Sequence, residues 1–247
     1  MAEGRKRKSK EKRVKLLPLL LIIILCVAMV IPMLLMGGCG QKASRVTLYI
    51  TRHGQTTDNV REVFSGQKGD ASLTDEGRTQ AIALGESISD IVFEKAYSSD
   101  LSRAKETLAL ALSENRDWTS SGKTPETRSG LNDIDLGEAE GMTASEVSEK
   151  FGDIFGEATD QSFVSPAGGE TVYQFLQRFD ETISEIAKDN EVLGKNVMIA
   201  CHSSADWWLE SKFPDVAGKG LLNAAITKVE YSNGNWKLLM YNGRTVE

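Results

Sequence analysis

The first clear pattern of secondary structure lies in Val46-Thr47-Leu48-Tyr49-Ile50-Thr51-Arg52-His53-Gly54-Gln55-Thr56. Every second residue from 46 to 50 is aliphatic, the period of a β-strand, and the strand then runs out into a polar loop at His53. The chain has only two histidines, and the other one, His202, follows a second apolar run at residues 197–201. Ligands gather at the carboxyl ends of strands in an open α/β sheet, so we expect both imidazoles to meet at one site.

Strand and helix patterns alternate along the rest of the domain. Apolar runs predict further strands at 93–98 and 197–201 and a hairpin over 227–241, with its turn at 232–235. Helices are predicted after Thr74, which is a plausible N-cap, over residues 101–112 and from near Glu170. Residues 113–126 are polar and predicted to be irregular. This order favours an α/β fold, a three-layer α/β/α sandwich with a mostly parallel central sheet.

Residues 1–38 differ from the rest in composition. Eight Lys/Arg lie among residues 1–15, and the 21 residues from 16 to 36 contain no charged side chain. As a helix they would span about 32 Å, enough to cross the hydrocarbon core of a bilayer. The basic flank predicts a cytoplasmic N-terminus, with the rest of the chain on the extracytoplasmic face.

The end of this segment, Leu34-Leu35-Met36-Gly37-Gly38-Cys39, resembles the lipobox of bacterial lipoproteins, whose cysteine becomes the lipidated first residue of the mature protein. We therefore expect lipid on Cys39, a linker over 39–45 and one domain over 46–247. The apolar run exceeds the usual signal-peptide core of about 7–15 residues, so an uncleaved signal anchor is the alternative. Either way, the domain is tethered to the cell membrane and faces away from the cytoplasm.

The charge of the domain excludes one class of partner. Residues 1–38 hold eight of the 29 Lys/Arg and two of the 35 Asp/Glu, so the remainder has 21 basic and 33 acidic residues, a net charge of −12. Nucleic acid is not expected as a partner, because phosphate backbones need clustered cations. We expect no disulfide within the domain, and we expect Cys201 to be a small buried hydrophobe rather than a thiol nucleophile.

Several motifs resemble those of the histidine phosphatase superfamily, which includes the phosphoglycerate mutases. The first is Arg52-His53-Gly54-Gln55-Thr56 with Asn59, similar to the family signature R-H-G-[EQ]-T-x-x-N. The others follow in the family's order: Ser65-Gly66-Gln67, residues 72–81, residues 98–107 with Arg103, residues 131–141 with Asp133, residues 166–171, His202, and Leu222-Asn223.

The resemblance implies a phosphohistidine mechanism, and the residue types suit it. Neutral His53 would attack phosphorus and form a covalent intermediate, splitting one difficult step into two. Arg52 and Arg103 would each hold phosphoryl oxygens through paired N–H bonds, and His202 would stabilise the shifting charge. The resemblance adds Asn59, Ser65 and Gly66 as phosphate-binding residues. No cofactor is implied, and the sequence shows no ligand cluster typical of a metal site.

Two positions depart from the family pattern. Asp133 stands where the family has a glutamate proton donor; we expect Asp133 to be the general acid, with Asp135 or Glu138 as alternatives. Ser203 stands where the family commonly has glycine, and its hydroxyl would either cap the following helix, which we favour, or bind a phosphate oxygen. Glu140 is expected to support its loop.

These patterns predict an extracytoplasmic, membrane-tethered phosphatase, a phosphoric monoester hydrolase of the histidine acid type acting on a small phosphorylated substrate. The alternatives are phosphoglycerate mutase-type phosphotransfer and a catalytically weak phosphate-binding lipoprotein. Mutases of the family carry an extended insert after the acid-bearing loop, where this chain has only a short segment. Four aromatic residues are candidates for either the pocket or the core: Phe64, Phe163, Trp207 and Trp208.

Overall fold

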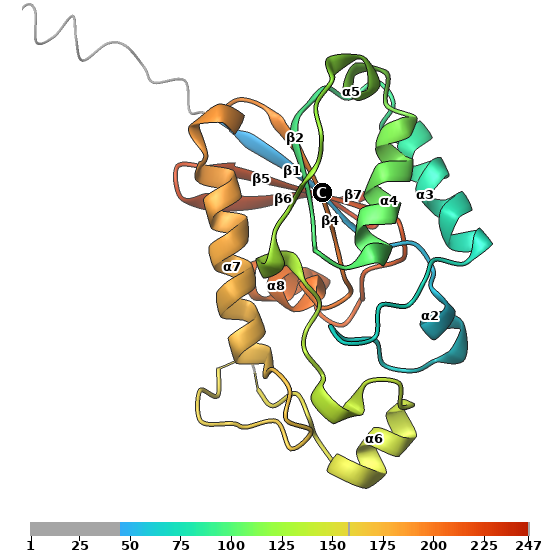
Figure 1. The fold of residues 1–247 in the computed structure, drawn as a ribbon. Helices are drawn as coiled ribbons and strands as arrows, with labels where there is room; N and C mark the ends of the chain where they lie inside the picture. The colour runs from blue at the N-terminus through green and yellow to red at the C-terminus, as the bar shows by residue number, and fades with distance from the viewer. Residues whose placement is uncertain (1–44, 158, 247) are drawn as a thin grey trace, which may run out of the picture. The chain divides into compact units, whose positions relative to one another are not determined.

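The central element of the computed structural model is a seven-stranded sheet with the order β3-β2-β4-β1-β5-β6-β7 (Figure 1). β4 pairs in parallel with both β1 and β2, and β2 pairs in parallel with β3, whereas β5, β6 and β7 each pair antiparallel to their neighbour. Because β6 returns to the direction of β1, only β5 and β7 run against the rest, and the sheet is mixed but mostly parallel. The strands are β1 Val46–Arg52, β2 Phe93–Ser98, β3 Glu126–Thr127, β4 Asn196–Cys201, β5 Ile226–Ser232, β6 Asn235–Tyr241 and β7 Arg244–Thr245.

The structure describes residues 45–157 and 159–246. The predicted membrane segment, Cys39 and nearly all of the predicted linker lie outside these residues. Within them, no helix has the length and apolar character needed to cross a bilayer.

Helices cover both faces of the sheet, which confirms the three-layer prediction. In Figure 1, α3 and α4 lie on one side of the sheet and α7 lies on the other. The helices are α2 Thr57–Arg61, α3 Asp75–Ser87, α4 Ser102–Ser113, α5 Arg116–Ser121, α6 Ala144–Phe151, α7 Val172–Lys188 and α8 Ala205–Lys212. Four short 3₁₀ turns join them: η1 Ser129–Leu131, η2 Gly137–Ala139, η3 Asn190–Val192 and η4 Pro214–Val216.

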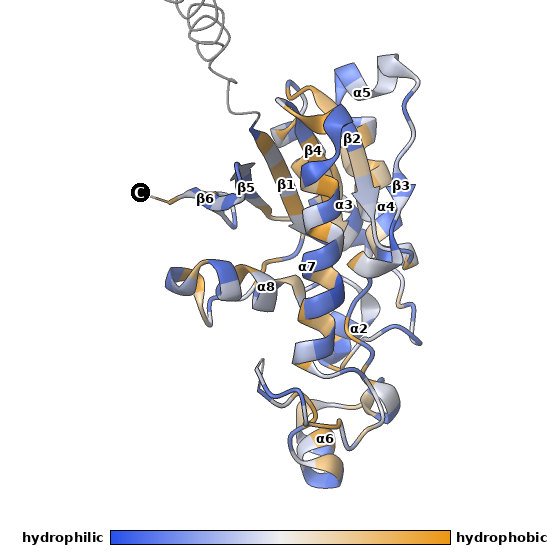
Figure 2. Ribbon diagram, turned by 90° about the vertical axis from the view of Figure 1, so that its left-hand side faces the viewer, coloured by the Kyte–Doolittle hydropathy of each residue, from blue (hydrophilic) through white to orange (hydrophobic). Residues whose placement is uncertain are grey.

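The alternation in β1 divides the core in two. Leu48 and Ile50 are fully buried in the cluster that includes the apolar stripe of α7 and the buried face of α8, whereas Tyr49 belongs to the cluster under α3 and α4. The strands β1 and β4 are largely apolar in Figure 2, while α7 shows an apolar and a polar face. A fully buried side chain of this size contributes about 1.5–3 kcal/mol, so this burial holds both helical layers on the sheet.

The helix starts follow local capping chemistry. The Thr74 hydroxyl accepts a hydrogen bond from Gly77 N at 3.0 Å, which confirms the predicted N-cap of α3. Thr171 and Gln174 form a reciprocal capping box at the start of α7. The predicted hairpin is confirmed as β5 and β6, and Asn233 and Gly234 both have positive φ in its turn, as tight hairpins require.

The prediction of an irregular segment over 113–126 is wrong. It contains α5, whose N-cap Asn115 accepts a hydrogen bond from Trp118 N at 2.9 Å. The helix turns Trp118 into the cluster under α3 and α4, where the ring is buried. Tertiary burial of one aromatic ring therefore overrides the polar composition of the segment.

Candidate active site

Three parallel strands deliver the central side chains of the site. His53 follows β1, Ser99 follows β2 and His202 follows β4, so all three lie at the same edge of the sheet. The two imidazole rings are buried, with centroids 5.3 Å apart. The convergence of the two histidines is therefore confirmed, and it follows from parallel pairing of β1 with β4, in which Arg52 is in register with Cys201.

The backbone fixes the tautomer of His53. Its Nδ1 lies 2.7 Å from the carbonyl oxygen of Gly54, which can only accept, so Nδ1 carries the proton and Nε2 keeps its lone pair. Burial lowers the pKa of His53 well below its usual value, and the charges of Arg103 and Arg52 lower it further. Both effects favour the neutral ring, whose Nε2 lone pair is the nucleophile. A Cβ on Gly54 would run into the carbonyl of Gly77, and a Cβ on Gly77 would run into the carbonyl of Gln55, so the close approach that sets this geometry needs glycine at both positions.

Arg52 and Arg103 bring two guanidinium groups to the same site. Arg52 donates from Nη1 to the carbonyl of Leu221 at 3.0 Å. Arg103, in the first turn of α4, is fully buried and donates from Nη2 to Gly66 O at 2.9 Å and to Asp133 Oδ2 at 3.1 Å. The buried Nε of each arginine has no hydrogen-bond partner within the described part of the chain. Buried N–H groups are normally paired, so these donors favour an anionic ligand.

His202 offers a third donor. Its Nε2 lies 2.7 Å from the hydroxyl of Ser99, which also accepts from Leu101 N. The neighbouring Asp133 carboxyl, which accepts, favours the tautomer of the neutral ring that carries its proton on Nδ1, and in this tautomer Nε2 accepts from the Ser99 hydroxyl. This Nδ1 is buried without a hydrogen bond and lies 3.6 Å from Asp133 Oδ2. Burial, followed by the charge of Arg103, lowers the pKa of His202 well below its usual value.

Asp133 is held inside the site by two side chains. The Ser204 hydroxyl donates to Oδ1 at 2.6 Å, and Arg103 binds Oδ2. Burial raises the pKa of Asp133 above its usual value, while the charge of Arg103 and the hydrogen bond from Ser204 act in the opposite direction. A carboxyl group with a raised pKa that faces a reactive imidazole can serve as a general acid. Sequence reasoning missed Ser204, although it follows the departure already noticed at Ser203.

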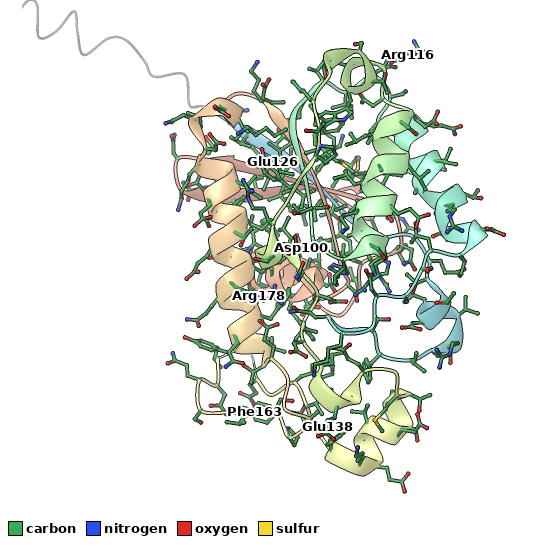
Figure 3. The ribbon with its side chains drawn as sticks, viewed as in Figure 1. Asp100, Arg116, Glu126, Glu138, Phe163 and Arg178 are labelled. Atoms are coloured by element: carbon green, nitrogen blue, oxygen red, sulfur yellow. The ribbon has the colours of Figure 1, made fainter. Side chains whose placement is uncertain are left out.

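Arg178 fixes the backbone of the acid-bearing loop and was also missed. It reaches from α7 (Figure 3) and donates to the carbonyl oxygens of Gly130, Asn132 and Asp133 at 2.7–3.1 Å. Both oxygens of Glu170 accept from the same guanidinium, at 2.6 and 2.7 Å. The only signal in the sequence was an arginine eight residues after the Gly-Gly-Glu that precedes α7.

A cavity of about 400 Å³ is lined by Arg52, His53 and Asp133, together with Asn59 and Ser65 from the segment after β1. Arg103 and His202 are buried beside Asp133 and are not among the lining residues. Asn59 Oδ1 accepts from Thr56 N at 3.1 Å and from Asn223 Nδ2 at 3.3 Å, so this side chain also ties the loop together. Ser65 donates to Asp58 at 2.7 Å.

Gly66, which was expected to bind phosphate, instead binds Arg103. It is not among the residues that line the cavity; its carbonyl accepts from Arg103, and a Cβ at this position would run into the Glu140 carboxyl. Glu140 itself accepts from the backbone N–H groups of Gln67, Lys68 and Gly69 at 2.8–3.0 Å. It thus supports the loop, as predicted.

The alternatives left open for the acid lie outside the cavity. Neither Asp135 nor Glu138 lines it, and Glu138 lies near α6 in Figure 3. Asp135 instead accepts from Gly137 N at 2.8 Å. Asp133 is therefore the carboxyl group of its loop that lines the cavity with His53.

The favoured capping role of Ser203 is wrong. The N-cap residue of α8 is Ser204, no side-chain bond caps that helix, and Ser203 is an exposed residue of the cavity wall. Cys201 is fully buried, and burial raises the pKa of its thiol to about 12, so it is the small hydrophobe that was expected.

The aromatic candidates divide between pocket and core. Phe64 and Trp207 line the cavity, Trp208 is fully buried in the core, and Phe163 lies in the segment before α7 without lining the cavity (Figure 3). Phe155, which was not singled out, lines the cavity as well. Within residues 45–157 and 159–246, no group of acidic, histidine or cysteine side chains is arranged to hold a metal ion.

Comparisons with known proteins agree with this geometry. A family model for the histidine phosphatase superfamily (branch 1) matches residues 48–244. A broad-specificity phosphatase of Saccharomyces cerevisiae is 32% identical over 193 residues, which cover 75% of this chain and 80% of the yeast protein. A 2,3-bisphosphoglycerate-dependent phosphoglycerate mutase of Beijerinckia indica is 31% identical over 166 residues, covering 64% of this chain and 76% of the mutase.

Similarity extends to solved structures. The crystal structure of phosphoglycerate mutase from Bacillus anthracis matches with a TM-score of 0.68 at 26% identity, covering 83% of this chain and 93% of that one. The family match takes in both strand-end histidines, Arg52, Arg103 and Asp133, and it spans almost all of the described residues. The chain therefore belongs to the histidine phosphatase superfamily.

Proposed function

We propose that the protein hydrolyses phosphomonoesters through a phosphohistidine on His53. The observation that carries this proposal is the buried group of donors around a neutral imidazole: Arg52, Arg103 and His202 surround the position that a phosphoryl group would take in front of His53. Such preorganised donors stabilise the charge that develops on phosphoryl oxygens during transfer.

In the first step, His53 Nε2 forms a bond to phosphorus while the bond from phosphorus to the ester oxygen breaks. Asp133 gives its proton to that oxygen, so the alcohol leaves neutral. In the second step, Asp133 takes a proton from water, the water oxygen bonds to phosphorus, and the bond to Nε2 breaks. Inorganic phosphate and the original state of both residues result.

The directions of the pKa shifts support acid-type activity. The depressed pKa of His53 keeps the nucleophile unprotonated as the pH falls, and the raised pKa of Asp133 keeps the acid protonated to higher pH than an ordinary aspartate. Both shifts favour activity on the acidic side of neutrality, limited toward alkaline pH by loss of the proton from Asp133.

Hydrolysis is favoured over mutase chemistry by the charges of the cavity. A mutase must hold a substrate with two phosphoryl groups, and a second group needs cations of its own. Among the described residues that line the cavity, Arg52 is the only arginine or lysine, and it is already part of the donor group around His53.

The test is direct. The full chain is incubated with p-nitrophenyl phosphate, and His53→Ala is the control variant. We expect turnover and an acid-labile, alkali-stable phosphoryl group on His53, both lost in His53→Ala. Interconversion of 3- and 2-phosphoglycerate in the presence of 2,3-bisphosphoglycerate, faster than hydrolysis, would establish the mutase. Phosphate binding without any turnover would establish the binding protein.

We also propose that the domain is tethered to the extracytoplasmic face of the cell membrane through lipid on Cys39. The basic flank, the uncharged run over 16–36 and the small residues before Cys39 support it. Mass spectrometry of the N-terminus from a membrane fraction tests it. A diacylated Cys39 as first residue is expected; an intact Met1 would instead establish the signal anchor.

A further inference from the structure

Much of the cavity lining is apolar. The apolar lining residues Val63, Phe64, Leu136, Phe155, Trp207 and Leu221 are called here the apolar wall. They come from the segment between α2 and α3, from the loops before α6 and α7, from α8 and from the loop before β5. A phosphoryl group in front of His53 would place the leaving group of a monoester in the same cavity as this wall.

The rings of the apolar wall hold one another in place. Phe155 meets Phe64 with ring centroids 6.0 Å apart and Trp207 with centroids 5.3 Å apart, both edge to face. Trp207 also contacts Phe175 of α7 at 5.9 Å, which connects the wall to the core. Edge-to-face contacts of this kind are favourable, so the wall is preorganised and a ligand need not order it.

The backbone of Phe64 is fixed as well. Its N–H donates to Met142 O at 2.8 Å, and its carbonyl accepts from Gly141 N at 2.8 Å. Phe64, Phe155 and Trp207 are only partly buried against the core, and each lines the cavity. Their remaining apolar surface is therefore available to a ligand.

An acidic side chain lines the cavity next to this wall. Asp206, which precedes Trp207 in α8, also lines the cavity, and its Oδ1 accepts from the Tyr241 hydroxyl at 2.6 Å. A carboxylate or second phosphate on the leaving group would meet this carboxyl, and the described lining residues offer it no cation beyond Arg52. Like charges at short range in a partly desolvated site disfavour binding.

We propose that the site selects monoesters with one phosphoryl group on an apolar or aromatic leaving group, and that it discriminates against leaving groups that carry a second anion. This inference rests on the proposed phosphatase activity. A phenyl ring would add to the edge-to-face contacts of Phe155 and Trp207, while Asp206 would disfavour an anion in the same space.

The experiment compares three primary alkyl phosphates, whose ester bonds are similarly reactive: 2-phenylethyl phosphate, glycerol 1-phosphate and 3-phosphoglycerate. For the full chain we expect kcat/KM to fall in that order, by about tenfold or more at each step, because small apolar differences alone discriminate by that amount. Equal or higher kcat/KM for 3-phosphoglycerate than for 2-phenylethyl phosphate would overturn the inference while leaving the phosphatase intact.

Two variants assign the effect to the wall and to the carboxyl group. Trp207→Ala is expected to lower kcat/KM for 2-phenylethyl phosphate by about tenfold, with partial recovery in Trp207→Phe, and to change glycerol 1-phosphate much less. Asp206→Asn is expected to reduce the ratio of kcat/KM for 2-phenylethyl phosphate to kcat/KM for 3-phosphoglycerate. Equal losses on all three esters in Trp207→Ala would contradict the proposed role of the wall. If the wild-type chain hydrolyses none of the esters, nor p-nitrophenyl phosphate, the proposed function fails instead.

Discussion

Replacing Ser204 by alanine removes one hydrogen bond and leaves the rest of the site in place. The Ser204 hydroxyl donates to Asp133 Oδ1 at 2.6 Å in a buried environment, and it acts to lower the pKa of Asp133. After the substitution, Oδ1 keeps only the hydrogen bond from Ile134 N at 3.1 Å, while Oδ2 keeps Arg103. The charged form of Asp133 is therefore less stable in the variant, and its pKa rises further.

The size of the effect follows from the type of bond. A hydrogen bond to a charged group contributes about 1.5–3 kcal/mol, which corresponds to a rise of about one to two pH units in the pKa of Asp133. Protonated Asp133 is the active form in the first step, so the alkaline limb of activity moves to higher pH by this amount. A carboxyl group held by one fewer bond is also less well placed, which we expect to lower the maximal kcat by about tenfold to a hundredfold.

The assay is the pH dependence of kcat/KM and kcat for an alkyl phosphate, whose poor leaving group needs the proton. Ionisation of the substrate is common to both enzymes, so the difference between their curves reports the protein. Ser204→Thr, which keeps a hydroxyl, is expected to retain part of the wild-type profile. Ser211→Ala is the matched control, because Ser211 lies on the same helix and donates only to the Trp208 carbonyl at 2.7 Å. An unchanged alkaline limb in Ser204→Ala would refute the role assigned to this bond, whatever happens to the rate.

Three further substitutions test other parts of the structure. Arg103→Lys keeps the positive charge but loses the forked donors of a fully buried guanidinium. We expect kcat/KM to fall by about a hundredfold or more, with an unchanged circular dichroism spectrum. A fall in kcat/KM of less than about threefold would contradict the place of Arg103 in the donor group. Arg178→Met removes the side chain that binds three carbonyl oxygens of the acid-bearing loop and pairs with Glu170. We expect kcat to fall by about tenfold or more, while the His53 phosphoenzyme remains detectable. Loss of the phosphoenzyme would contradict a role limited to the acid-bearing loop. Phe179→Ala opens a cavity in the core cluster under α7 and should lower the free energy of unfolding, measured in urea, by about 3–5 kcal/mol. Val164→Ala changes a side chain that is 81% exposed and should alter this free energy by less than about 0.5 kcal/mol. Equal losses of unfolding free energy in the two variants would contradict the assignment of Phe179 to the core.

Local patterns were sufficient for most of the elements and for the position of the main groups. The period of two in residues 46–50, the capping threonine before α3 and the Asn-Gly turn of the hairpin each depend on neighbours in the chain, so their structures could be read from the sequence. α5 could not, because its formation depends on the burial of Trp118 against helices far away in the sequence.

The cavity walls show the same division. His53 and His202 are 149 positions apart, yet their convergence could be predicted, because parallel strands end at one edge of a sheet. No such rule applies to Phe155, which reaches the cavity from a loop, or to Ser204, whose hydroxyl meets Asp133 across 71 positions. Loop conformations follow from many weak contacts rather than from a repeating backbone pattern.

The α/β class, the family and the residues available for phosphoryl transfer could be derived from the chain alone, because periodicity and ordered motifs are properties of the chain. The folded molecule was needed to identify the carboxyl group that shares the cavity with His53, the hydroxyl that holds it and the rings that form the apolar wall. Those properties depend on distances between segments that are remote in the chain, and they exist only after the sheet and its helices have packed.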